Sequence, residues 1–267
     1  TARKHEIRDN IVSGNWHMYN LEQYVTRSEM VEYKRLIDDS QAVYNRERQK
    51  QLRKEGRNME CVFITGDSGT GKTTLAKKMC KEKALDYFVS SGGQNPFDDY
   101  QGEPVIILDD MRPSTLGLSD LLKLLDNNTA SYVKARYANK AIDCKMIIIT
   151  TVLDIETFFA RVFENESETA VQLKRRCKTK IVLSKTNMDF YVYDEVKRDY
   201  SSPLKLPNTV LQEYKPVELT EAEKLRKASE LLGGLQGISQ ALKSQIDAQI
   251  EGEQMELGDP SDDFPWQ

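Results

Sequence analysis

The sequence predicts an α/β fold with a central parallel sheet, preceded by a small helical segment and followed by a loop-rich and helical extension. Residues 1–58 show apolar residues at helical spacing and no strand pattern. From Cys61 onwards, short apolar runs alternate with amphipathic helical stretches, which is typical of a parallel sheet covered by helices on both faces. After Tyr193, prolines punctuate the chain and this alternation weakens. We therefore expect three parts, residues 1–58, 59–195 and 196–267.

The net charge of −4 over 267 residues hides an uneven distribution. Residues 217–267 hold 11 acidic and 4 basic residues, a net −7, so the remainder carries +3. A mildly basic body is compatible with binding a nucleic acid. No window approaches the ~20 apolar residues of a membrane span. We therefore expect no contact with a membrane. Four widely spaced cysteines and two histidines form no zinc-binding pattern, so we expect the cysteines to be reduced thiols in a cytoplasmic protein.

The first part is expected to be mainly one long helix. Ser28 is predicted to cap a helix from about Glu29 to Glu55, after a short helix at Leu21–Val25. The apolar stripe of the long helix is too long for its short neighbour to cover, so we expect residues 1–58 to mediate oligomerisation. The stripe consists of Met30, Tyr33, Ile37 and Tyr44.

The middle part contains five predicted strands and the helices between them. The strands are expected at Val62–Thr65, Tyr87–Ser90, Val105–Asp109, Met146–Thr150 and Ile181–Ser184. The helices are expected at Thr73–Lys83, Ser119–Leu125 and Ile155–Phe163. The last part is expected to contain helices at Glu221–Leu232 and Ile238–Ile250, before a disordered end at Glu251–Gln267.

A phosphate-binding loop is predicted where the first of these strands ends. Residues Gly66–Thr73 fit the pattern GxxxxGK[ST], with a buried strand before them and a helix after them. Lys72 is expected to reach the β- and γ-phosphates of ATP, and Thr73 to offer its hydroxyl to Mg²⁺. The residues expected to contact the nucleotide are Gly66, Asp67, Ser68, Gly69, Thr70, Gly71, Lys72, Thr73 and Thr74.

Polar residues at the ends of two further strands complete the predicted site. Asp109 and Asp110 follow an apolar run, so Asp109 is expected to hold Mg²⁺ and Asp110 to orient or deprotonate the attacking water. The run Met146–Thr151 ends in Thr150 and Thr151. We expect this strand to lie between the phosphate-loop strand and the two-carboxylate strand, with its hydroxyls near the water or γ-phosphate.

These motifs resemble superfamily-three helicases, in particular Rep proteins of circular single-stranded DNA viruses and related rolling-circle plasmid initiators. The likeness spans roughly Cys61–Ser184 and also rests on Phe97–Gly102, Val133–Lys140 and Gln172–Arg176. The resemblance implies a modified AAA+ fold that forms a hexameric ring and moves along single-stranded DNA. It also implies a bacterial cytoplasm as the location if the gene lies on a plasmid.

The resemblance assigns roles to further residues. Lys134, Arg136, Tyr137 and Lys140 are expected to lie in a loop that grips DNA in the central channel. Arg175 or Arg176 is expected to be an arginine finger, reaching the γ-phosphate bound by a neighbouring subunit. Val152 departs from the pattern, because the family usually has an asparagine there. No His-x-His pair of a nicking nuclease occurs, so we expect the chain to be the motor part of a longer protein.

Other functions fit the same motifs. A P-loop switch or loader would oligomerise on ATP without separating strands, and an RNA helicase of the same superfamily would carry the same residues. A small-molecule kinase is disfavoured, because paired acids and a lysine-bearing loop occupy the place of its acceptor pocket and lid. The acidic, aromatic end Asp259–Gln267 is expected either to solubilise the chain or to dock on host replication proteins.

Overall fold

The computed structural model describes residues 2–90, 96–112, 116, 118–128, 132–134, 139–162, 170–211, 220–232, 234 and 238–256. The chain divides into two compact units, Thr1–Glu213 and Tyr214–Gln267. The boundary lies later than the residue 196 expected for the start of the C-terminal extension. The first unit holds the predicted phosphate loop and is described first.

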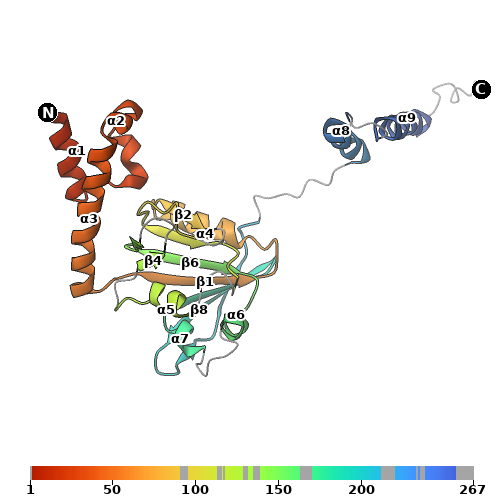
Figure 1. Ribbon diagram of the computed structural model, residues 1–267. Coiled ribbons are helices and arrows are strands. Elements are labelled where there is room, and N and C mark those ends of the chain that lie inside the picture. Colours follow the sequence, from red (N-terminus) through yellow and green to blue (C-terminus); the bar gives the residue numbers. More distant parts are fainter. Residues whose placement is uncertain are drawn as a thin grey trace, which may run out of the picture. The chain divides into compact units, whose positions relative to one another are not determined.

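A mixed sheet forms the centre of the first unit (Figure 1). Its strands follow the order β10-β8-β7-β1-β6-β3-β2, with β9 beside β8. The parallel strands are β1 (Glu60–Gly66), β2 (Tyr87–Ser90), β3 (Val105–Leu108), β6 (Met146–Thr151) and β7 (Thr179–Leu183). The predicted α/β class and the five predicted strands are confirmed. The structure also has the predicted neighbours, because β6 pairs with β1 on one side and with β3 on the other.

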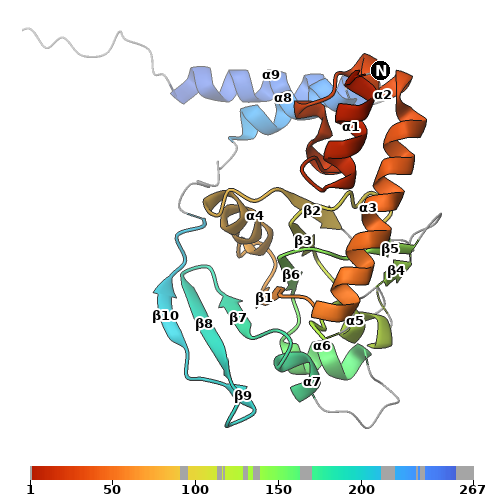
Figure 2. The same cartoon turned by 90° about the vertical axis from the view of Figure 1, so that its left-hand side faces the viewer.

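Three antiparallel strands at one edge of the sheet were not predicted. They are β8 (Asn187–Asp194), β9 (Asp199–Tyr200) and β10 (Leu204–Pro207), seen beyond β7 in Figure 2. β8 is only partly buried along its length and β10 is exposed, so neither forms a buried apolar run in the sequence. The loop-rich region expected after residue 195 is therefore, up to Pro207, an extension of the same sheet.

Helices cover both faces of the sheet (Figure 1). The side chains of β1 alternate between the two faces. Val62 and Ile64 pack with the inner side of α4 (Lys72–Glu82). On the other face, Phe63 packs edge to face against Phe158 of α6 (Ile155–Val162), with ring centroids 5.7 Å apart. The same face is covered by α5 (Leu118–Leu124) and α7 (Val171–Lys174).

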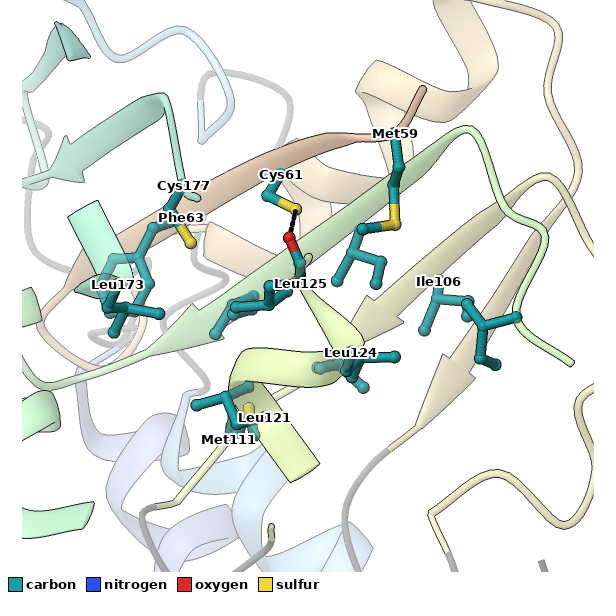
Figure 3. Close-up of a cluster of buried hydrophobic side chains, with 14 of the residues drawn as sticks. Met59, Cys61, Phe63, Ile106, Met111, Leu121, Leu124, Leu125, Leu173 and Cys177 are labelled. Carbon is teal, nitrogen blue, oxygen red and sulfur yellow. Dashed lines mark hydrogen bonds between the residues drawn. The ribbon is translucent and has the colours of Figure 1, made fainter. Parts of the chain in front are cut away.

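Figure 3 shows the core cluster on this second face of the sheet, with α5 packed beneath β1 and β3. Cys61 points into the cluster, and its thiol donates to the Leu125 carbonyl over 3.9 Å. Burial raises the pKa of the Cys61 thiol to about 12. All four cysteines are buried free thiols, as the sequence predicts.

The N-terminal helices form a core of their own and correct two predictions. They are α1 (Ala2–Val12), η1 (Met18–Gln23), α2 (Arg27–Glu32) and α3 (Lys34–Glu55). Thr26, and not Ser28, caps the helix: its hydroxyl accepts from the Glu29 N–H, and the Glu29 carboxylate accepts from the Thr26 N–H. The long helix also breaks at Tyr33, which separates α2 from α3.

Helix α1 was not predicted, because only Ile7 and Ile11 form its buried side. These two residues pack with Leu21, Val25 and Ile37, and Met30 and Tyr33 lie against the same cluster. Much of the apolar stripe is therefore covered within the chain. The stripe therefore does not need a neighbouring subunit for its burial, and a role of residues 1–58 in oligomerisation stays a prediction.

Two arginines fix this helical segment to the sheet. Arg48 on α3 forms a bidentate ion pair with Asp143, at 2.5 Å from Nε and 3.1 Å from Nη2. Arg57, only 8% exposed, donates to the carbonyls of Lys123, Leu124 and Asp126 at the end of α5. Carbonyls at the C-terminus of a helix lack the partners that an added turn would supply, so the buried guanidinium caps α5.

The second unit contains α8 (Glu221–Leu232) and α9 (Ile238–Glu256). The prediction of α8 is confirmed at both ends. α9 runs six residues past the predicted end at Ile250, so the expectation of disorder from Glu251 was wrong for residues 251–256. The acidic, aromatic end Asp259–Gln267 lies outside the described residues. In the part of the chain that the structure describes, no helix is long and apolar enough to cross a membrane.

Candidate nucleotide-binding site

The loop between β1 and α4 requires glycine at both of its ends. Gly66 ends β1 with φ of +144°, and a Cβ there would stand 2.1 Å from the Leu183 carbonyl oxygen. Gly71 precedes the first residue of α4 with φ of +91°. No other residue type adopts these two conformations without strain or collision. The glycines therefore allow the backbone to wrap tightly and to present the N–H groups that begin α4.

Lys72 lies across this loop without an acidic partner. Its ammonium donates to the carbonyls of Gly66 at 2.7 Å and Asp67 at 2.8 Å. Partial burial lowers the pKa of Lys72, and the nearby carboxylates, Asp110 foremost, oppose that shift. Among the described residues no carboxylate forms an ion pair with it. A cation held in this way beside free helix N–H groups fits an anionic ligand such as a polyphosphate.

The carboxylate of Asp109 joins three elements at the edge of the sheet. Its Oδ1 accepts a hydrogen bond of 2.6 Å from the Thr73 hydroxyl at the start of α4. The same oxygen accepts a bond of 2.8 Å from the Thr150 hydroxyl of β6. The structure thus brings the predicted metal pair, Thr73 and Asp109, into direct contact. Neighbouring hydroxyl and carboxylate oxygens are the donors that Mg²⁺ prefers, so these residues fit the implied ion.

Asp110 lies next to this network in a strained conformation. Its φ of +46° is uncommon for a residue with a Cβ, and such residues gather at functional sites. Its N–H donates to the Thr150 hydroxyl over 2.9 Å, which ties the turn to β6. Its carboxylate is largely exposed and lies 3.8 Å from the Arg112 guanidinium. Arg112 was not among the predicted site residues, although its position two residues after the acidic pair was a usable signal.

The structure separates the two threonines that the sequence left as alternatives. Thr150 and Thr151 are both 1% exposed. Thr150 contacts Asp109 and Asp110, whereas the Thr151 hydroxyl accepts a bond of 3.3 Å from the Leu153 N–H. Thr150 is therefore the hydroxyl built into the site, and Thr151 supports the turn after β6. Val152, in the place where the family usually has asparagine, is half-exposed.

A segment after β10 also reaches the phosphate loop, and this contact was not predicted. Asn208 is buried, and its side-chain amide donates to the carbonyls of Thr70 and Ser184. Val210 packs beside Gly71. A single asparagine more than a hundred residues from the loop leaves no pattern that a sequence alone would reveal.

Arg175 and Arg176 lie at the end of the sheet where β1 and β7 begin, opposite to the phosphate loop. They precede β7, whose Thr179 pairs with Val62 in the first half of β1, whereas the phosphate loop follows the end of β1. Both line a cavity of about 490 Å³. Arg176 is tied down within the chain, to Gln172 at 2.8 and 3.0 Å and to the Asp126 carboxylate at 3.7 Å. Arg175 is exposed.

Two of the predicted DNA-gripping residues, Lys134 and Lys140, lie on a pair of short antiparallel strands. β4 (Tyr132–Lys134) pairs with β5 (Asn139–Ala141) in antiparallel register, with Lys134 opposite Asn139 and Val133 opposite Lys140. Arg136 and Tyr137 lie outside the described residues. Lys134 and Lys140 of the expected loop are therefore strand residues, on β4 and β5.

The strand order, the glycine loop and the Thr73–Asp109 pair define a P-loop nucleotide-binding domain. A family model described as "RNA helicase" matches residues 62–153, which contain this site. A "Replication protein" of Onion yellows phytoplasma (strain OY-M) is 43% identical over 222 residues, covering 83% of this chain. The chain spans 58% of the length of that protein. Together the two matches support a helicase-type domain of a replication protein.

Two solved structures share parts of the fold at low similarity. NtrX from Brucella abortus, in complex with ADP, matches with a TM-score of 0.34 and 15% identity, covering 58% of this chain and 42% of its own. The C-terminal region of NrS-1 matches with a TM-score of 0.24 and 16% identity, covering 57% and 33%. Similarities at this level carry no argument about function.

Replacing Thr150 by valine should impair the site while keeping the shape of the core. Thr150→Val removes the hydroxyl that orients Asp109 and leaves the Asp110 N–H without its partner, a loss of about 1–3 kcal/mol of unfolding free energy. Misplacing these carboxylates should slow ATP hydrolysis on the order of 100-fold. Steady-state hydrolysis and urea unfolding measure both effects. Thr151→Val is the matched control, and an equal or larger loss of hydrolysis in that variant would contradict the assignment.

Proposed function

We propose that this chain is the ATP-driven motor domain of a replication initiator, which moves along single-stranded DNA as a hexameric ring. The observation that supports this most is the Thr73–Asp109–Thr150 network beside the half-buried Lys72. It joins a phosphate-binding loop to the acidic pair that ATP hydrolysis requires. The matches to a helicase family model and to a replication protein favour a motor over a simple kinase.

Each residue of the site has a distinct role in this proposal. Residues Gly66–Thr74 hold the phosphates through backbone N–H groups, and Lys72 exchanges the carbonyls of Gly66 and Asp67 for phosphate oxygens. Thr73 and Asp109 would hold Mg²⁺, which when bound neutralises charge on the phosphates. Asp110 orients the attacking water and accepts its proton. Thr150 fixes both acids at once, because its hydroxyl donates to Asp109 and accepts from the Asp110 N–H.

Hydrolysis is proposed to need a neighbouring subunit. Arg175 and Arg176 lie at the end of the sheet away from the phosphate loop of their own chain. They would therefore contact the nucleotide bound by a neighbouring subunit. Arg175 is the better candidate for the finger, because it is exposed while Arg176 is bound to Gln172 and Asp126. In this ring the helical segment 1–58 is proposed to contribute to assembly, through surfaces other than the stripe already covered by α1.

The nucleic acid is proposed to be DNA, bound by Lys134 and Lys140 of β4 and β5 together with Arg136 and Tyr137. Basic side chains would contact phosphates, and the tyrosine ring would stack on a base. RNA is the alternative that the "RNA helicase" description of the family model favours. A switch or loader that assembles on ATP without strand separation is the other alternative. A bacterial cytoplasm is the proposed location, and docking of the C-terminal tail on host replication proteins is part of the same proposal.

Lys72→Ala should abolish ATP hydrolysis in a folded protein. Losing the phosphate-facing cation removes charge stabilisation in the transition state, which should cost at least about 100-fold in kcat. Hydrolysis and strand separation on a forked duplex are measured beside Lys77→Ala, an exposed lysine on the same helix α4. Undiminished turnover in Lys72→Ala would refute the nucleotide site, whereas wild-type hydrolysis without strand separation in the unmodified chain would favour the switch.

Lys140→Ala should uncouple ATP hydrolysis from movement on the strand, and Arg136→Ala should act in the same direction. Basal turnover should persist, while stimulation by single strands falls and the salt dependence of binding flattens by about one unit of slope for each lost phosphate contact. Binding is measured on DNA and RNA oligomers of the same sequence. An unchanged slope would show that these residues do not contact the strand, and preferential stimulation by RNA would replace DNA in the proposal.

Arg175→Ala and Arg176→Ala should fail in different ways. Arg175→Ala should lower ATP hydrolysis about 1,000-fold without changing the melting temperature. Arg176→Ala should lower the unfolding free energy, because Asp126 and Gln172 lose their partner. Mixing Arg175→Ala with Lys72→Ala chains should restore part of the activity, since each complements the other at an interface. No recovery in rings proven to be mixed would place the arginine's action within one subunit.

A further inference from the structure

We infer that Asn208 is a positioning residue of the nucleotide site, which aims the Gly71 N–H into the phosphate loop. This inference rests on the proposed function, because it concerns the same site. Asn208 directly follows β10, the outermost strand on that side of the sheet. After β10 the chain returns to the phosphate loop, where Asn208 contacts Thr70. None of the motifs of the P-loop includes it.

The amide of Asn208 is almost fully used. Its Nδ2 donates to the Thr70 carbonyl at 3.0 Å and to the Ser184 carbonyl at 2.6 Å. Its Oδ1 accepts from the Val210 N–H at 3.1 Å, and its own N–H donates to the Thr186 carbonyl at 2.8 Å. The residue is 5% exposed. A buried amide bonded on both sides holds its partners firmly, because any movement would leave a polar group unpaired.

The bond to Thr70 determines where the next N–H points. The Thr70 carbonyl and the Gly71 N–H belong to one planar trans peptide unit, on which they face opposite ways. Drawing the carbonyl towards Asn208 therefore turns the N–H of Gly71 away from it. Within the described part of the chain, no hydrogen bond uses that N–H, and Gly71 immediately precedes Lys72 at the start of α4. The N–H is thus free to meet a phosphate oxygen.

Residues that follow Asn208 also pack against Gly71. A Cβ added at Gly71 would stand 3.0 Å from Val210 Cγ1 and 3.3 Å from Leu211 Cδ2. Both side chains come from the turn that Asn208 begins, and Val210 is 6% exposed. Thr70 itself is 1% exposed, and its hydroxyl donates to the Asp67 carbonyl at 2.9 Å. The segment Asn208–Leu211 therefore closes the loop from outside, and glycine at position 71 leaves room for it.

The test is phosphate affinity in the full chain carrying Asn208→Ala. Affinity for ATP and for inorganic tripolyphosphate should both fall about ten-fold, because the misdirected N–H contacts phosphate and not the nucleoside. The kcat at saturating ATP should stay within about three-fold, since Lys72 and the acids are untouched. Asn208→Ser keeps one donor and should recover part of the affinity. The matched control is Asn187→Ala, an exposed asparagine at the start of β8.

The melting temperature without nucleotide shows whether each variant folds. If Asn208→Ala does not fold, Asn208→Ser decides the question through a fall of about three-fold or more for both ligands. Affinities equal to those of Asn187→Ala, or a loss for ATP without a loss for tripolyphosphate, would overturn the inference. Lys72→Ala is measured in parallel. If it too keeps full affinity and turnover, the proposed nucleotide site fails as well; if it is inactive while Asn208→Ala is normal, only the role of Asn208 is lost.

Discussion

The shared hydrogen bonds of the Asp109 carboxylate hold the candidate site together. One oxygen accepts from Thr73 of α4 and from Thr150 of β6, while Asp109 itself follows β3. This convergence depends on the insertion of β6 between β1 and β3. Neighbouring strands lie about 4.8 Å apart, so a strand end placed one position further out could not reach the same carboxylate. The order of the strands in the sheet therefore determines the geometry of the candidate site as well as the fold.

A second polar network lies at the end of the sheet opposite to the phosphate loop. Arg57 enters the α5 C-terminus and bonds the Asp126 carbonyl, while the Asp126 carboxylate contacts Arg176. The helical segment, the end of α5 and the arginine pair are thus joined through one residue. In the proposed ring, this end of the sheet would face the phosphate loop of the next chain, and the proposed dependence of hydrolysis on a neighbour rests on that arrangement.

The phosphate loop depends on residues from distant parts of the chain. Gly66 faces the Leu183 carbonyl of β7, and Thr70 is held by Asn208 after β10. The antiparallel strands at the edge of the sheet therefore do more than extend it, because they return the chain to the loop. The first unit accordingly extends to Glu213 and includes Asn208. A domain that ended at residue 195 would lack this contact with the phosphate loop.

The sequence by itself determined the class of fold, the five parallel strands and the phosphate loop. These features are readable because each depends on a local pattern: a buried apolar run, helical spacing, or glycines at set distances from a lysine. It also predicted that Asp109 and Thr73 would act together, since the carboxyl ends of parallel strands meet at one edge. Local pattern failed at α1, where two isoleucines among charged residues leave almost no periodic signal.

Only the tertiary structure decided which of several equivalent residues enters the site. Thr150 and Thr151 are adjacent in sequence and equally buried, and only the register of β6 against β1 and β3 sends the first to Asp109. Arg175 and Arg176 differ because one is held by Asp126, a residue of another element. Asn208 is the extreme case, since its importance comes from a contact across 138 positions of the chain. Such contacts depend on how the strands are ordered in space, and a sequence read along its length does not contain that order.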